Sequence, residues 1–85
     1  MNKTININLA STFFYIDEDA YDVLQHYLKR LESAFKKTAG KEEILGDIEA
    51  RIAELFQEYK KHNSYVINKS DVAKAINGLG QVDIN

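Results

Sequence analysis

Few side chains in this 85-residue chain combine the residue types and the spacing that chemistry requires. Asp22 and His26 are four residues apart, so on a helix their side chains are neighbours that could give a metal ion two ligands. The sequence offers no clear third or fourth ligand, and it has no cysteine for a thiolate site or a disulfide. We therefore interpret the pair as a solvated surface contact and predict no metal site.

The other polar residues do not form a recognisable catalytic group. Two carboxylates that act as acid and base must be desolvated so that their pKa values separate, and most acidic residues between positions 41 and 61 fall on the polar side of a helical pattern. The serines lack a neighbouring base and an orienting group, and no phosphate-binding glycine motif occurs. The sequence predicts that the chain is not an enzyme and binds no cofactor, and no small-molecule ligand is inferred.

The clearest structural signal is the stretch from Lys41 to Lys61, whose apolar residues recur at alternating steps of three and four. These residues are Ile44, Leu45, Ile48, Ile52, Leu55, Phe56 and Tyr59. They cover about a third of a helix circumference, and charges fill most of the rest. We predict that this stretch is an amphipathic helix and the main core element, with Asp47 and Arg51 forming a surface ion pair.

A β-hairpin is predicted before this helix. Residues 3–10 alternate between polar and apolar side chains, with Ile5, Ile7 and Leu9 on one face, which is typical of a half-buried strand. A short polar turn and a second strand over residues 13–16 follow. The rest of the protein is expected to cover the apolar face of this hairpin.

A helix is expected from Asp17, as N-cap, to about Lys37, with Gly40 in a left-handed conformation closing it. In the preceding strand, Phe14 and Ile16 are expected to face inward. The apolar residues of this helix cover nearly half of its circumference. We therefore expect it to pack against both the sheet and the 41–61 helix, as one arm of an αα-hairpin.

In the C-terminal part of the chain, we predict a short strand over residues 65–67 and a last helix. A capping box of Asn68 and Asp71 is expected at the start of this helix. The helix is expected to end around Gly78 or Gly80. Its inward residues are expected to be Val72, Ala75, Ile76 and Leu79.

The order of elements is therefore ββααβα, an α+β fold in one domain over residues 1–85. It predicts a small antiparallel or mixed sheet of about three strands, with a long αα-hairpin and a C-terminal helix packed on one face.

Two surface features are candidates for contact with a partner. The first is a strip of small residues, Gly46, Ala50 and Ala53, which would let another backbone approach closely. A glycine inside a helix costs about 1 kcal/mol relative to alanine, which makes Gly46 unexpected. The second is a basic patch near the interhelical turn, made of Lys29, Arg30, Lys36, Lys37 and Lys41. Both also have plain structural interpretations, as good helix formers and as a solvated charged face.

The charge and hydropathy of the chain indicate where the protein is located and which classes of partner it is expected to bind. The net charge is −2, whereas a nucleic-acid-binding domain usually has a basic face. No apolar run approaches the roughly 18 residues of a membrane span, and the N-terminus lacks the apolar segment of a signal peptide. The sequence predicts a cytoplasmic chain.

Three stretches together resemble one family. They are residues 5–10, residues 14–21, and the run Asp47-Ile48-Glu49-Ala50-Arg51-Ile52-Ala53-Glu54-Leu55-Phe56. Residues 3–80 resemble the N-terminal cytoplasmic segment of PspC-domain (phage shock protein C-like) proteins of Bacteroidetes bacteria. The resemblance implies the cytoplasmic face of the inner membrane, a longer membrane-associated protein in which a PspC domain follows, and a role in the stress response. It supplies no catalytic residue.

The first hypothesis for function is therefore a non-enzymatic protein-interaction and regulatory module of an envelope-stress protein, which binds another protein or itself. The alternative is a DNA-binding, stress-responsive transcriptional regulator, which predicts salt-sensitive duplex binding around the basic patch. Small-molecule sensing is a third class, and it requires a pocket.

Overall fold

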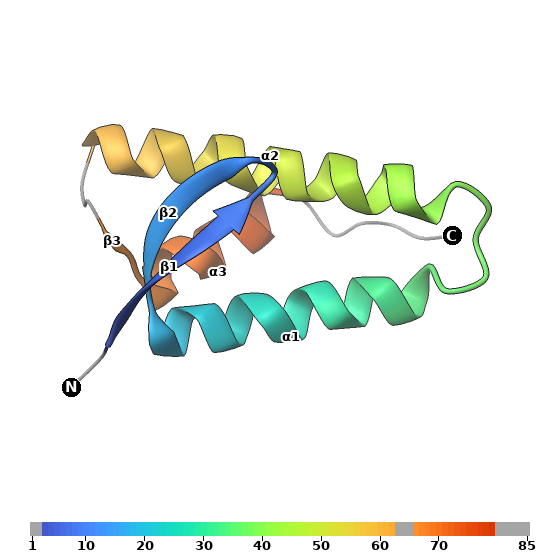
Figure 1. The fold of residues 1–85 in the computed structure, drawn as a ribbon, viewed down its shortest axis with the longest axis horizontal. Coiled ribbons are helices and arrows are strands. Elements are labelled where there is room, and N and C mark those ends of the chain that lie inside the picture. The colour runs from blue at the N-terminus through green and yellow to red at the C-terminus, as the bar shows by residue number, and fades with distance from the viewer. Residues whose placement is uncertain (1–2, 63–65, 80–85) are drawn as a thin grey trace.

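The computed structural model describes residues 3–62 and 66–79, and in these two segments it contains three strands and three helices. In chain order they are β1 (Thr4–Leu9), β2 (Thr12–Asp17), α1 (Glu18–Ala34), α2 (Lys41–His62), β3 (Val66–Ile67) and α3 (Lys69–Gly78) (Figure 1). The predicted α+β fold with the order ββααβα is confirmed. Tyr65 and Gly80, at the predicted ends of β3 and α3, lie outside the described residues.

The strands form a mixed sheet in the order β1-β2-β3, with β1 antiparallel and β3 parallel to β2. Ile5 lies opposite Ile16, and Ile7 opposite Phe14, so the apolar residues of both strands share the inner face. Phe14 and Ile16 are buried, as the alternation predicted. The sheet therefore buries one face and leaves the other open.

The connection between β1 and β2 is a two-residue turn. Ala10 has φ 51° and Ser11 has φ 67°, so both central residues are left-handed. This is the geometry of a type I′ turn, whose twist matches that of the paired strands. Glycine or asparagine usually fills these positions, and their absence here leaves backbone strain in the hairpin.

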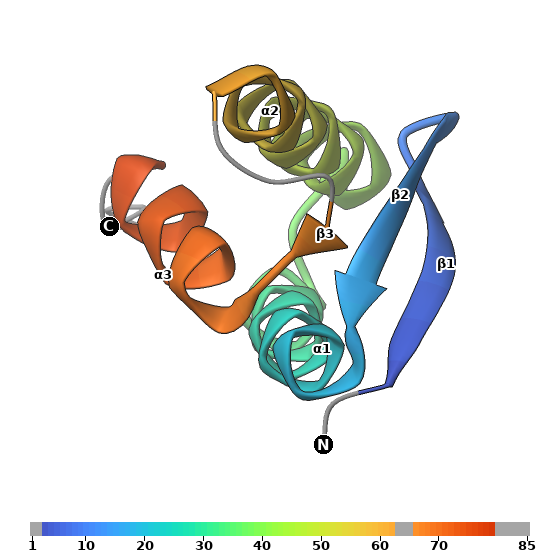
Figure 2. The ribbon, with the colours of Figure 1, turned by 90° about the vertical axis from the view of Figure 1, so that its left-hand side faces the viewer.

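The three helices surround the core from different sides. Figure 2 shows α1 and α2 on opposite sides of β3, with α3 facing the β1–β2 hairpin across the interior. The main contacts of α1 are to α3 and β2, and those of α2 are to α3, β3 and β1. The sequence predicted that α1 packs directly on α2, and this prediction is corrected: the two helices run in opposite directions, but each has its main contacts with α3 and with the strands.

The core joins the sheet to all three helices. Its largest fully buried side chains are Phe14, Phe56, Ile16, Leu24, Ile52, Ile67 and Val72. Phe14 of β2 and Phe56 of α2 meet edge to face, with ring centroids 5.6 Å apart and an interplanar angle of 85°. Aromatic pairs favour this geometry because the positive ring edge faces the negative ring face. This pair fixes α2 on the sheet.

The helix termini differ from the predictions in detail. Asp17 is the N-cap of α1, but its side chain makes no capping hydrogen bond. The helix ends at Ala34 rather than near Lys37. Gly40 is left-handed, as predicted, with φ 75°. However, its carbonyl accepts the amide of Ile44 at 3.2 Å, so this glycine opens α2 instead of closing α1.

Candidate functional site

The outer face of the sheet exposes two aromatic side chains. Because Phe14 and Ile16 point inward, the pleat of β2 turns Phe13 and Tyr15 outward. Phe13 is 66% exposed and Tyr15 is 40% exposed. The strand register puts Asn8 of β1 opposite Phe13. The alternation of the sequence already indicated this outward pair, and the predicted packing of the helices on one face of the sheet agrees with its exposure among the described residues.

A groove lies between β1 and α1. Its volume is about 490 Å³, which falls within the usual range of about 300–1,000 Å³ for ligand sites. β1 forms one wall from Asn6 to Leu9, and α1 forms the other with a stripe of side chains that includes Tyr21 and Leu28. Glu49 of α2 also lines the groove. Sequence reasoning missed this groove because its walls come from elements whose relative placement no local pattern specifies.

The small-residue strip is not one surface. Gly46 and Ala50 are exposed, as expected for a contact strip. Ala53 is only 4% exposed and belongs to the core with Ile52 and Phe56, which corrects its assignment to the open flank of α2. The reason is that α2 packs on α3, β3 and β1 together, so the core covers a wider arc of this helix than the apolar periodicity indicated.

The basic residues on α1 point into different parts of the surface. Lys29 lines the groove beside β1. Arg30, its neighbour in the chain, lines a separate hollow with Tyr27 and with Ile76 of α3. Successive residues on a helix are about 100° apart, so these two cations face apart.

The remaining basic residues are mixed with acidic ones. Lys36 and Lys41 line a hollow at the α1–α2 connection together with Glu32 and Glu42. Lys37 is exposed in the same connection. The predicted basic patch therefore does not form one continuous positive face, and a phosphate backbone approaching it would also meet carboxylates.

Within the described residues, the acid–histidine pair on α1 is not joined by the further ligands that a metal site needs. The Nδ1 of His26 lies 2.7 Å from the backbone carbonyl of Asp22, so this nitrogen donates its hydrogen to that oxygen. The other ring nitrogen, Nε2, could still bind a metal, because metal-bound histidines commonly donate their second N–H to a backbone carbonyl in this way. Among residues 3–62 and 66–79, no group of three or more His, Cys, Asp or Glu side chains is arranged to hold a metal ion.

The ion pair on α2 also differs from the prediction. The Nη1 of Arg51 lies 3.0 Å from the Oε1 of Glu54, one turn later, rather than pairing with Asp47. Both side chains are more than half exposed, so solvent screens the contact and it contributes little to stability.

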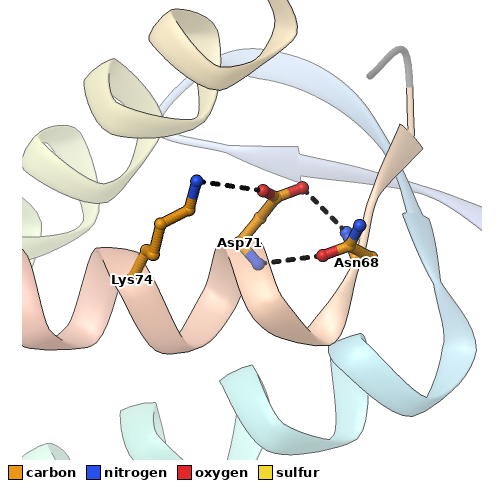
Figure 3. Close-up of polar contacts among 3 residues, drawn as sticks. All are labelled: Asn68, Asp71 and Lys74. Carbon is orange, nitrogen blue, oxygen red and sulfur yellow. Dashed lines mark hydrogen bonds and ion pairs between the residues drawn. The ribbon is translucent and has the colours of Figure 1, made fainter. Parts of the chain in front are cut away.

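Asp71 is a buried carboxylate with a structural role. It is 4% exposed and lies in the first turn of α3. Its backbone amide donates to the Oδ1 of Asn68 at 2.9 Å, and its own Oδ2 accepts the amide of Asn68 at 3.1 Å (Figure 3). The Nζ of Lys74 lies 3.9 Å from its Oδ1. The predicted capping box is confirmed.

Two tyrosines near α3 have perturbed acidity. Burial raises the pKa of Tyr59 above the ordinary value of 10.0, and the negative charge of Asp71 raises it further. Lys74 Nζ lies 4.7 Å from the centre of the Tyr59 ring, a cation–π contact. Burial also raises the pKa of Tyr27. Both phenols therefore stay neutral at physiological pH, which suits packing more than acid–base chemistry.

Comparison with known protein families, curated proteins and solved structures gives no match. Within the described segments, no helix combines the length and the apolar character needed to cross a membrane.

Proposed function

We propose that this chain is a non-enzymatic protein-interaction and regulatory module that binds another protein or itself through the outer face of its sheet. The observation that carries this proposal is the exposure of Phe13 beside Tyr15. Burying a phenylalanine side chain stabilises a structure by about 1.5–3 kcal/mol relative to leaving it in water. Aromatic residues are enriched in protein interfaces, where this gain is realised on binding.

We further propose that the module belongs to a PspC-like envelope-stress protein and acts at the cytoplasmic face of the inner membrane. The support is the resemblance of residues 47–56 and of both hairpin strands to that family. Ile52, Ala53 and Phe56 of this run are buried and are needed for the fold. Ala50 is exposed and is not needed for it, so with Gly46 it forms a second candidate contact.

Association can be tested with the purified chain and with cells. Sedimentation velocity from micromolar to millimolar concentration measures self-association. Capture from bacteria grown with and without envelope stress, followed by reconstitution from purified components, tests binding to another protein. We expect saturable binding in at least one of these assays. A chain that stays monomeric and binds no reconstituted partner contradicts the proposal.

A further inference from the structure

The second open feature of the sheet is the edge of β1. The strand order places β1 at the rim of the sheet, paired with β2 on one side only. Within the described residues no strand covers its other side. Natural proteins usually protect a sheet edge with lysine, proline, a bulge or a very short strand, or cover it with a helix or loop. β1 is six residues long and reads Thr-Ile-Asn-Ile-Asn-Leu, so between Thr4 and Leu9 it has no lysine or proline, and its register with β2 has no bulge. On this side α1 leaves a groove beside the strand.

The register shows which backbone groups of β1 face this open edge. Leu9 and Thr12 flank the two-residue turn, so they form a hydrogen-bonded pair. At the other end of the hairpin, the carbonyl of Lys3 accepts the amide of Glu18 at 2.7 Å. Hydrogen-bonded and non-hydrogen-bonded pairs alternate along an antiparallel ladder. The odd-numbered residues of β1 therefore bond to β2.

It follows that Thr4, Asn6 and Asn8 direct their backbone N–H and C=O groups away from β2, toward the open edge. Asn6 and Asn8 both line the groove between β1 and α1. The groove thus has a wall of main-chain donors and acceptors with the spacing of a β-strand. Main-chain groups of this kind are matched by another extended backbone.

The opposite wall of the groove supplies an apolar contact surface. Tyr21, Leu24 and Leu28 follow helical spacing on the face of α1 that borders the groove. Leu24 is buried, whereas Tyr21 and Leu28 are partly exposed. The phenol oxygen of Tyr21 accepts a hydrogen bond from the Nε2 of Gln25, which holds the ring in place. Every second side chain of a strand added to β1 would point toward this wall.

The residues that line the groove carry more negative than positive charge. Glu32 and Glu49 contribute two carboxylates, and Lys29 contributes one ammonium group. An occupant with a basic side chain near its end is therefore favoured over one with an acidic side chain.

We propose that the groove between β1 and α1 binds an extended, basic-flanked peptide segment of a partner protein, which adds to the sheet as a fourth strand beside β1. Its alternate apolar side chains pack on the α1 wall, and its backbone bonds to Asn6 and Asn8. Like the proposed function, this site would bind a protein. Its residues are different, because they do not include the aromatic pair on the outer face.

A second copy of the chain fits this edge less well than a peptide. Pairing β1 with β1 of another copy would bring two α1 helices, one from each copy, beneath the same pair of strands. Paired strands are only about 4.8 Å apart, whereas a helix with its side chains is about 10 Å wide. The α1 wall leaves room for one added strand, but it would clash with the α1 helix of a second copy.

The proposal can be tested by NMR titration of the isotope-labelled chain with a short acetylated and amidated peptide that alternates valine and threonine between terminal lysines. We expect shifts at Asn6, Asn8 and Leu28, and weaker binding of a counterpart with terminal glutamates. Two analogues of the peptide, N-methylated on the backbone amides of one edge or of the other, should differ in affinity. Blocking the edge that faces β1 should weaken binding by about tenfold or more, because main-chain hydrogen bonds are lost.

Variants of the protein provide the matching control. Asn6→Pro removes an edge-facing N–H without removing a bond to β2 and should abolish peptide binding, whereas Asn6→Thr should preserve it. Amide spectra establish that both variants are folded. Phe13→Thr should bind the peptide normally, so this site and the outer face can fail separately. Absence of binding, equal binding of the N-methylated analogues, unchanged binding by folded Asn6→Pro, or a β1-mediated dimer of the free chain would each overturn the proposal.

Discussion

At the scale of single residues, Asp71 illustrates how a small core accommodates a charge. One of its oxygens accepts the Asn68 amide and the other lies near Lys74, so the buried carboxylate is partnered on both sides. A buried carboxylate without such partners would be strongly destabilising. The capping box therefore fixes where α3 begins, and Val72, the next residue, is fully buried.

We predict that Asn68→Ala lowers the free energy of unfolding by about 1 kcal/mol, because the Asp71 amide loses its acceptor. Asn68→Ser retains a capping oxygen and should lose much less. Urea denaturation followed by circular dichroism measures both variants. Equal stability of Asn68→Ala and the wild type would show that the capping box contributes nothing.

The raised pKa of Tyr59 predicts how stability changes at alkaline pH. A folded-state pKa above the unfolded value means that the neutral phenol favours the folded state, so its contribution is complete below about pH 10 and is lost as pH rises through the folded pKa. Tyr59→Phe keeps the ring beside Lys74 but cannot ionise. Its unfolding free energy should therefore fall less than that of the wild type between about pH 9 and about pH 11. Parallel pH curves for the two proteins would contradict this assignment.

At the scale of elements, the hairpin turn requires two left-handed residues, and the residues at these positions are not ones that favour that conformation. Both Ala10 and Ser11 are left-handed, a conformation that costs an L-residue roughly 1–2 kcal/mol. The pairing of β1 with β2 holds the turn in this state. A single substitution to glycine in this turn should therefore increase the stability of the protein.

We predict that Ser11→Gly raises the free energy of unfolding by about 0.5–1 kcal/mol, since glycine accepts the left-handed conformation without a steric penalty. Thr12→Gly, in the extended strand that follows, serves as the control and should be destabilising. Thermal and urea denaturation measure the two effects. A loss of stability in Ser11→Gly would mean that the Ser11 side chain contributes more than the backbone strain removes.

Gly46 provides a second test at this scale. A Cβ at this position would meet nothing within 4 Å, so Gly46→Ala should stabilise α2 by about 1 kcal/mol. Gly40→Ala should instead be destabilising, because its φ of 75° disfavours alanine. Weaker partner binding by the stabilised Gly46→Ala variant would support a close backbone approach at this point. Unchanged binding would remove Gly46 from the contact.

The sequence determines most of these elements locally. Alternation in β1, helical spacing in α2 and the Asn68–Asp71 pair each predicted a feature that the structure contains. The burial of Ala53 was missed because it depends on α2 packing on α3, β3 and β1 together. The role of Gly40 was missed because α1 ends at Ala34, earlier than predicted, so this glycine lies at the start of α2. No local sequence pattern predicted the groove beside β1, because its walls come from separate elements.

At the scale of the whole molecule, the fold is an elongated domain of 38 × 23 × 22 Å whose core lies on one side of its sheet. Phe14 and Phe56 connect the sheet to α2, and the three helices occupy the interior side (Figure 2). The outer face of β2 and the edge of β1 take no part in this core. Among the described residues, they are two of the surfaces through which we propose that the protein binds a partner.

The most direct test of the proposed interaction module is a binding isotherm for self-association or for the reconstituted partner, comparing Phe13→Thr with Val23→Thr. Val23 lies on α1 and is the matched control, because each variant removes one exposed apolar side chain. At position 13, threonine retains the strand preference of β2. We predict that Phe13→Thr weakens binding by about tenfold or more while both variants keep the stability of the wild type. Equal binding by both variants, with the fold intact, would contradict the assignment of the outer face as the interaction surface.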